Sequence, residues 1–142
     1  MARAKKGLGL PTSAKERGEV AELLFAAKAA SLGFTVLQPY GQTRPFDLVV
    51  EFEGRMARVQ VKSRWTPARA PRGYEVGLHG CHRPYRVGDL DFIAAYVAPI
   101  DTWYIIPFAE IPTKTTVCIP RAREKSKYSK YKEAWGLMIG KK

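Results

Sequence analysis

Apolar residues near the N-terminus follow the pattern of a helix. Ser13 and Glu16 form a predicted capping box, and the helix that they open is expected to end at Gly33. From Val20 onward alanine and leucine occur nearly all round, which predicts a helix buried on most sides. Glu22 lies inside this apolar run. Because burying an unpaired carboxylate is costly, Glu22 is expected either to meet a cation, a metal ion or water, or to reach solvent at the rim.

The pattern then changes to strands. Residues 34–45 predict a short strand followed by a Gly/Pro loop, and residues 46–63 predict a β-hairpin with alternating apolar positions. Residues 64–88 are rich in Gly, Pro and Arg, which predicts a long loop or irregular excursion. Residues 91–97 and 102–108 are apolar enough to be strands at the centre of a sheet.

The last seventeen or so residues, 126–142, combine lysines with aromatic residues. Tyr128, Tyr131, Trp135 and Met138 fall at helical spacing, so we expect a helix packed onto the body or onto a second subunit. Together these elements predict one α/β domain over residues 1–142, with a mixed sheet flanked by helices. The basic residues 1–12 are expected to be mobile.

The hairpin gathers polar side chains on one face. If residues 53–54 form a two-residue loop, counting back along both strands sets Asp47 opposite Gln60. Asp47 then shares a face with Gln60 and Lys62, whereas the alternate apolar residues face a core. The sequence therefore predicts a carboxylate, an amide and an ammonium group at the open end of the hairpin.

The charge balance points to a polyanionic partner. The chain has 24 Lys and Arg against 13 Asp and Glu, a formal net charge of +11. Nucleic acid is the leading candidate, because cations that neutralise phosphates release condensed counterions, and on charge alone ribosome-like RNA binding stays open. Aromatic residues interleave with the arginines of residues 62–86, which favours a nucleic-acid groove over a solvated loop. The candidate nucleic-acid-binding residues are Arg64, Arg69, Arg72, Arg83 and Arg86.

Several classes of protein fit the sequence poorly. With only two cysteines there is no disulfide framework, and no apolar segment is long enough for a signal peptide or a membrane span. We therefore expect a soluble cytoplasmic protein without a membrane partner or a small-molecule cofactor. His79, Cys81 and His82 lie close together, but their spacing fits no structural zinc pattern.

Three separated motifs carry a family resemblance. Residues 18–22 on the predicted helix, 44–47 before the second strand, and the Gln-Val-Lys-Ser of residues 60–63 occur in an order that resembles the PD-(D/E)XK nuclease superfamily. Three features are similar to bacterial group I intron-associated homing endonucleases. They are the glutamine at position 60 in place of the usual Asp or Glu, the QPYG of residues 38–41 and the segment 88–107. The resemblance covers about residues 16–112 and implies a restriction-endonuclease-like core.

The resemblance implies roles for individual residues. Glu22, Asp47, Gln60 and Lys62 would be the catalytic residues, and the oxygens of Asp47, Gln60, Glu22 and the Val61 carbonyl would hold Mg²⁺. Phosphodiester hydrolysis needs a hard cation to bind a phosphate oxygen and to acidify water, and such a cation prefers oxygen ligands. Lys62 would position or deprotonate the attacking water and steady the phosphate charge.

The implied activity is metal-dependent cleavage of double-stranded DNA by a homodimer or homotetramer, because cutting both strands usually takes two sites. Two alternatives stay open. One is a structure-selective nuclease such as a Holliday-junction resolvase. The other is a catalytically inactive, basic nucleic-acid-binding protein, since the neutral Gln60 leaves the site with one anionic ligand fewer than the usual pair.

Overall fold

The computed structural model describes residues 9, 11–41, 43–78, 85–112, 115–121 and 125–140. Its elements, in chain order, are α1 (Ala14–Ser31), β1 (Thr35–Leu37), β2 (Leu48–Phe52), β3 (Arg55–Arg64), β4 (Tyr74–Gly77), β5 (Phe92–Val97), η1 (Ala98–Ile100), β6 (Thr102–Pro107), η2 (Phe108–Glu110), β7 (Thr116–Ile119), η3 (Ser129–Tyr131) and η4 (Trp135–Ile139). The η elements are short 3₁₀ helices.

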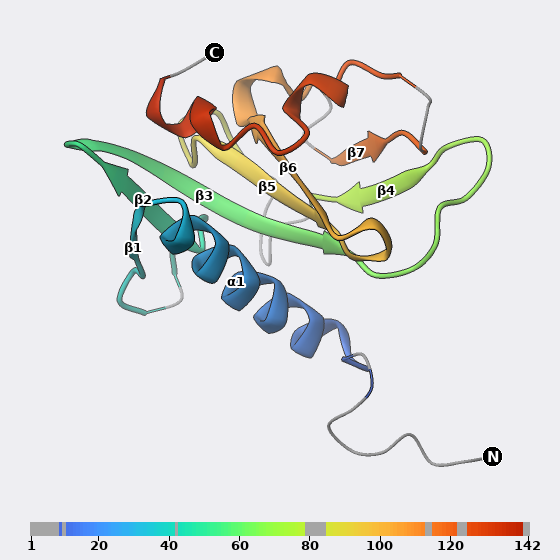
Figure 1. Cartoon of the computed structure of the whole chain (residues 1–142), viewed down its shortest axis with the longest axis horizontal. Helices are drawn as coiled ribbons and strands as arrows, with labels where there is room; N and C mark the ends of the chain where they lie inside the picture. Colours follow the sequence, from blue (N-terminus) through green and yellow to red (C-terminus); the bar gives the residue numbers. More distant parts are fainter. Residues whose placement is uncertain are drawn as a thin grey trace.

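A mixed five-stranded sheet with the order β1-β2-β3-β5-β6 forms the centre of the fold. Only β3 and β5 pair in parallel, and the other neighbours are antiparallel. Helix α1 lies along one face of this sheet, and the two-stranded β4–β7 ribbon lies to its other side (Figure 1). The predicted α/β class with a mixed sheet is confirmed, although the second face is covered by the ribbon rather than by an α-helix of the described residues.

Helix α1 begins and ends as its sequence predicts. The Ser13 hydroxyl accepts a hydrogen bond from the Glu16 backbone N–H at 3.1 Å, and Gly33, with φ of +95°, follows the last turn. Only one stripe of the helix is buried, Ala21, Phe25 and Ala29, and Leu23 is 70% exposed. The prediction of burial on most sides is therefore wrong, because the described part of the chain packs against a single face.

The β2–β3 hairpin has the predicted register from its turn inward. Phe52 pairs with Arg55 across the loop, and the alternation continues to Leu48 opposite Val59. Both loop residues, Glu53 and Gly54, have positive φ angles of 49° and 84°, as a type I′ turn requires. The right-handed twist of the strands favours this turn, which explains why a two-residue loop holds the register.

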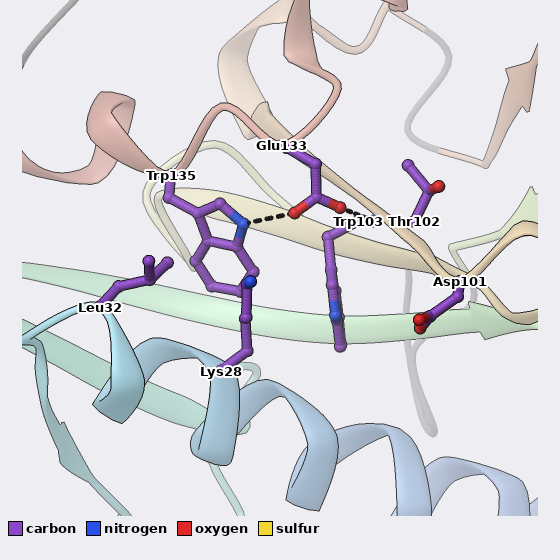
Figure 2. Close-up of a pocket in the computed structure, with 7 residues that line it drawn as sticks. All are labelled: Lys28, Leu32, Asp101, Thr102, Trp103, Glu133 and Trp135. Carbon is purple, nitrogen blue, oxygen red and sulfur yellow. Dashed lines mark hydrogen bonds between the residues drawn. The ribbon is translucent and has the colours of Figure 1, made fainter.

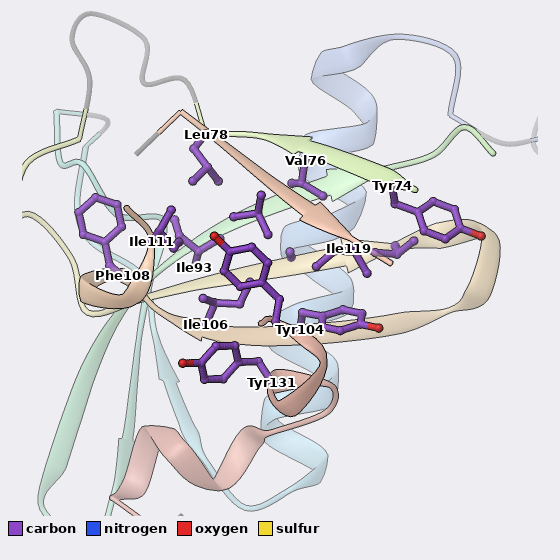
Figure 3. Packing of buried hydrophobic residues seen from close by; sticks show 14 of the residues in the cluster. Tyr74, Val76, Leu78, Ile93, Tyr104, Ile106, Phe108, Ile111, Ile119 and Tyr131 are labelled. Atoms are coloured by element: carbon purple, nitrogen blue, oxygen red, sulfur yellow. The ribbon is translucent and has the colours of Figure 1, made fainter. Parts of the chain in front are cut away.

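The region expected to be a long loop contains a strand. Residues 74–77 form β4, which pairs antiparallel with β7, with Tyr74 opposite Ile119. Together with the sheet face that carries Ile93 and Ile106, the ribbon encloses a core whose packing is drawn in Figure 3. The loop prediction is wrong here because a four-residue strand with a distant partner leaves little trace in local sequence.

The C-terminal segment is not the continuous helix that its spacing predicts. It contains two short 3₁₀ helices, η3 and η4, separated by Glu133 with φ of 49°. The segment crosses the edge of the sheet, so that Tyr131 belongs to the core on the ribbon side and Trp135 to the core on the α1 side. The predicted packing of its aromatic residues onto the body is confirmed.

Strand β6 is the last strand of the sheet, and the C-terminal segment covers its outer edge. The Glu133 N–H donates to the Trp103 carbonyl at 2.8 Å, and the Glu133 carboxylate accepts the Trp103 N–H at 2.6 Å. Tyr104 and Lys132 also pair as an isolated antiparallel β-bridge. These bonds satisfy an edge that would otherwise expose unpaired backbone groups.

No helix among the described residues is both long enough and apolar enough to cross a membrane. Most of the basic N-terminal stretch expected to be mobile, and all of His79, Cys81 and His82, lie outside the described residues.

Candidate active site

Asp47 lies just before β2, where the ladder with β3 stops. Its backbone N–H donates to the Val59 carbonyl at 2.9 Å, although Val59 is already paired with Leu48. Two consecutive residues thus face one partner, which is the pattern of a β-bulge. The direct pairing predicted for Asp47 and Gln60 is therefore not part of the ladder, because the bulge takes up one residue.

The Asp47 side chain nevertheless reaches β3. Its Oδ2 accepts the backbone N–H of Val61 at 2.8 Å, so that the carboxylate replaces the strand partner that β2 no longer provides. The Gln60 side chain also forms a hydrogen bond to Asp47, and the positive charge of Lys62 acts on the same carboxylate. Asp47 is the residue on which the predicted Gln60, Val61 and Lys62 converge.

Glu22 reaches this corner from α1. Burial, then repulsion by Asp47 and then by Glu19 raise the pKa of the Glu22 carboxyl from 4.5 to about 7. The repulsion shows that the negative charge of Asp47 is felt at Glu22, which an acid at the solvent rim of an isolated helix would not experience. The structure thus places Glu22 within the electrostatic influence of Asp47.

The pKa of Asp47 is also raised. Burial is the largest cause, and it outweighs the hydrogen bond from Val61, the charge of Lys62 and the hydrogen bond from Gln60, all of which lower the pKa. Two carboxyl groups with raised pKa values therefore lie together in a partly buried corner. Such an arrangement favours the binding of a cation, because a cation removes the penalty of keeping both groups ionised.

The donors at this corner suit a hard divalent cation. They are the two carboxylates of Glu22 and Asp47, the amide oxygen of Gln60 and the main-chain carbonyl of Val61, and all four are oxygens. Mg²⁺ is usually held by one or two carboxylates and completes its shell with water and substrate phosphates.

The candidate nucleic-acid-binding arginines fall into different environments. The Arg64 guanidinium donates to the main-chain carbonyls of Thr66, Glu75 and Pro67 at 3.0 to 3.3 Å, so it holds the loop after β3. Arg72 forms an ion pair with Glu75 at 3.2 Å.

Two further candidates, Arg69 and Arg86, are exposed, and Arg83 lies outside the described residues. Exposed cations of this kind are available to phosphates, whereas the guanidinium of Arg64 is already engaged with the protein backbone.

Sequence reasoning missed two contacts beside the site. Arg58, on the same face of β3 as Gln60, forms an ion pair with Asp91 at 3.1 Å and donates to the Gly88 carbonyl at 2.7 Å. The Lys62 Nζ lies 5.4 Å from the centroid of the Tyr85 ring. The alternation of Arg58, Gln60 and Lys62 was a visible signal, but their partners lie in a loop whose path the sequence does not determine.

A pocket of about 540 Å³ lies elsewhere, between the end of α1 and the C-terminal segment (Figure 2). Its carboxylates are already engaged, because Glu133 accepts the Trp135 indole N–H at 2.8 Å and Asp101 accepts the Tyr96 hydroxyl at 2.6 Å. None of the candidate catalytic residues lines this pocket. We regard its polar groups as structural, since Glu133 fastens the C-terminal segment to β6 and Asp101 links the β5–β6 connection to Tyr96 of β5.

Comparisons with known proteins agree with this geometry. The family model described as PD-(D/E)XK endonuclease matches residues 12–138. Protein 5.3 of Escherichia phage T7 is 34% identical over 104 residues, which are 72% of this chain and 86% of that protein. The structure of a bacterial homing endonuclease, I-Ssp6803I, superimposes with a TM-score of 0.77 at 30% identity and covers 91% of this chain and 95% of that chain. The predicted restriction-endonuclease-like core is thereby confirmed.

Proposed function

Because this chain belongs to the PD-(D/E)XK endonuclease family, we propose that it is a metal-dependent endonuclease that hydrolyses phosphodiester bonds in duplex DNA. The observation that carries the proposal is the convergence on Asp47, whose carboxylate is bound by the Val61 N–H and the Gln60 side chain and lies within the fields of Lys62 and Glu22. Three separate segments of the chain supply these groups, in the order that the family motif has.

The metal ion that we propose is Mg²⁺, held by Asp47, Glu22, Gln60 and the Val61 carbonyl. When bound, such an ion neutralises charge on a phosphate oxygen and acidifies an attacking water. The chain itself supplies the orientation of these oxygens. The Val61 N–H fixes one oxygen of Asp47, and α1 places the Glu22 carboxylate within the electrostatic influence of Asp47.

Lys62 is the proposed general acid-base and electrostatic residue. Its side chain lies on the same face of β3 as Gln60, and its positive charge acts on the Asp47 carboxylate. From there it positions the attacking water and offsets the negative charge that grows on the phosphate in the transition state. A neutral side chain at this position would leave that charge unbalanced.

The proposed substrate is double-stranded DNA. The net charge of +11 favours binding to a polyanion, and the similar structure I-Ssp6803I is described as a homing endonuclease. Exposed Arg69 and Arg86 are available to contact phosphates, and we propose the same role for Arg83, which lies outside the described residues. We further propose that the protein acts as a homodimer or homotetramer, because cutting both strands of a duplex usually takes two sites.

The test is cleavage of supercoiled plasmid, of linear duplexes with randomised inserts and of a four-way junction, with Mg²⁺ and with EDTA. We expect the wild type to give nicked or linear products from duplex DNA with Mg²⁺ but not with EDTA. We expect Lys62→Ala to give no products in either condition. The matched control is Lys28→Ala, which removes an exposed lysine that lines the pocket far from the motif.

Each alternative outcome has a distinct meaning. Equal cleavage by Lys62→Ala would remove the catalytic assignment. Preference for the four-way junction over duplex DNA would identify a structure-selective nuclease. Binding to every substrate without cleavage would identify a catalytically inactive binding protein, as the uncharged Gln60 would allow.

A further inference from the structure

The Lys62 side chain rests against an aromatic ring from a different part of the chain. Its Nζ lies 5.4 Å from the centroid of Tyr85, within the range in which a cation is attracted by the face of a ring. The Tyr85 residue is only 8% exposed, and Lys62 is half-buried. The Tyr85 ring is therefore part of the core, and the Lys62 ammonium group lies over it.

The position of Tyr85 is fixed from behind. Its ring meets Phe108 edge to face, with centroids 6.1 Å apart and planes at 85°, and Phe108 is 2% exposed. Both rings belong to the core under the β4–β7 ribbon, part of which Figure 3 shows around Phe108. This packing fixes the position of the Tyr85 ring, so the ring provides a rigid surface for the Lys62 side chain.

The chain that follows Tyr85 is clamped as well. The Arg86 N–H donates to the Asp89 carboxylate at 2.7 Å, and the Asp89 N–H donates back to the Arg86 carbonyl at 3.0 Å. The Arg58 guanidinium then holds the Gly88 carbonyl at 2.7 Å and both oxygens of Asp91 at 3.1 Å. The same face of β3 thus carries Lys62 and the arginine that anchors the loop beside it.

We propose that Tyr85 is a positioning residue that holds the Lys62 ammonium group beside Asp47 in the orientation needed for phosphodiester hydrolysis. The proposal rests on the function proposed above. Tyr85 acts through its ring face and not through its hydroxyl, since the Nζ lies over the ring. Removing the ring would take away this restraint and widen the range of Lys62 rotamers, and many of these rotamers would carry the ammonium group away from the reacting phosphate.

The kinetic test compares two substitutions. Tyr85→Phe keeps the ring and is expected to retain the kcat of the wild type, whereas Tyr85→Leu is expected to lower kcat about 10- to 100-fold with little change in KM. The chain offers a matched control in Tyr131, which is 7% exposed and has Lys130 Nζ at 5.2 Å from its ring. Tyr131→Leu costs similar core packing and is expected to leave kcat unchanged.

A second readout does not depend on catalysis. Reductive methylation with ¹³C-formaldehyde labels the lysines without removing their charge, and a methyl group over a ring face is shifted upfield in the NMR spectrum. The Lys62 signal, assigned by its loss in Lys62→Arg, is expected upfield in the wild type and in Tyr85→Phe. It is expected to return to the ordinary lysine position in Tyr85→Leu but not in Tyr131→Leu.

The two readouts separate the possible failures. No upfield Lys62 signal in the wild type would overturn the contact, even if the enzyme cleaves DNA. A full kcat in Tyr85→Leu would overturn the positioning role, even if the contact is present. An upfield signal in a wild-type protein that cleaves no DNA would overturn the proposed function, and with it the role of the ring in catalysis.

Discussion

The Asp47 carboxylate serves Val61 as a strand partner, because its Oδ2 accepts the Val61 backbone N–H at 2.8 Å. One side chain therefore does two things. It satisfies a backbone donor that the bulge at the end of β2 leaves without a ladder partner, and its carboxylate interacts with Glu22, Gln60 and Lys62. Structure and chemistry at Asp47 can be separated by choosing the substitution.

Asp47→Asn and Asp47→Ala are expected to differ in stability but not in activity. Asparagine keeps an oxygen that accepts the Val61 N–H, whereas alanine leaves that N–H unsatisfied and should cost about 1 to 2 kcal/mol of unfolding free energy. Both changes remove an anionic metal ligand and should lower cleavage by at least about a hundredfold. Urea unfolding and plasmid cleavage measure the two effects, and wild-type cleavage by Asp47→Asn would exclude Asp47 as a ligand.

Glu22→Gln is expected to stabilise the metal-free protein at alkaline pH. The folded-state pKa of Glu22, about 7, lies above its ordinary value of 4.5, so ionisation penalises the folded state. The penalty is absent below pH 4.5, grows as the pH rises to 7 and is complete above it. The stability advantage of Glu22→Gln should follow the same course in thermal melts with EDTA.

The control for Glu22 is Glu110→Gln, which changes an exposed acid on η2. At the upper end of the range from pH 4.5 to 7 it should change the melting temperature much less than Glu22→Gln does, because its side chain is exposed. A constant difference between Glu22→Gln and the wild type over this range would contradict the placement of Glu22 beside Asp47.

Gln60→Glu restores the acidic residue that the family motif normally has. In the metal-free protein a third carboxylate would repel Asp47 in place of the hydrogen bond that Gln60 now makes, so unfolding should become easier at pH 8. Added Mg²⁺ should reverse this loss and bind about tenfold more tightly than in the wild type, since more negative ligands raise affinity. Titration calorimetry checks the affinity, with the exposed Gln38→Glu as the control.

The hairpin shows what local sequence determines. The type I′ turn at residues 53–54 and the parity of the strands fix which side chains share a face, so the meeting of Asp47 with Gln60 and Lys62 could be predicted. The bulge at Asp47 could not, because it depends on how the chain enters β2. The role of Glu22 came from the family resemblance, since a helix pattern alone does not say what packs against it.

Non-local pairing accounts for the errors. β4 finds its partner β7 about forty residues away, and no alternation in four residues reveals such a pairing. In the tail, Tyr131 and Trp135 have helical spacing, but the positive φ of Glu133 lets them enter two different cores. The sequence shows Tyr85 as an aromatic residue among arginines. Its contact with Lys62, however, depends on packing against Phe108 and on the hydrogen bond from Arg58 to the Gly88 carbonyl.

Asp91→Asn tests the clamp between β3 and β5. Burial raises the pKa of Asp91, but the hydrogen bonds and charge of Arg58 outweigh it, and the pKa is lowered below 3.8. Asp91 therefore stabilises the fold above its unfolded-state pKa and loses this contribution as the pH falls through its folded-state value. Because the pair is partly exposed, the loss in Asp91→Asn at pH 7 should be about 1 kcal/mol.

Urea unfolding at pH 7 and pH 3 measures this contribution. The difference between Asp91→Asn and the wild type should shrink at pH 3, which lies below the ordinary Asp pKa of 3.8, because protonation of the unfolded state then offsets part of the contribution. Glu75→Gln breaks the more exposed pair with Arg72 and should cost less at pH 7. An equal cost for the two substitutions would show that Asp91 is no more than a surface charge.

Glu53 and Glu133 have the same φ of 49°, and the same substitution should affect them in opposite directions. Asparagine tolerates the left-handed region better than glutamate, so Glu53→Asn, next to Gly54 in the type I′ turn, should stabilise the protein by about 0.5 kcal/mol. At Glu133 the conformational gain is smaller than the loss. The shorter side chain cannot accept both the Trp103 N–H and the Trp135 indole N–H, and Glu133→Asn should cost about 2 kcal/mol. Thermal melts of the two variants measure both signs, and destabilisation by Glu53→Asn would mean that the hairpin loop is not a type I′ turn.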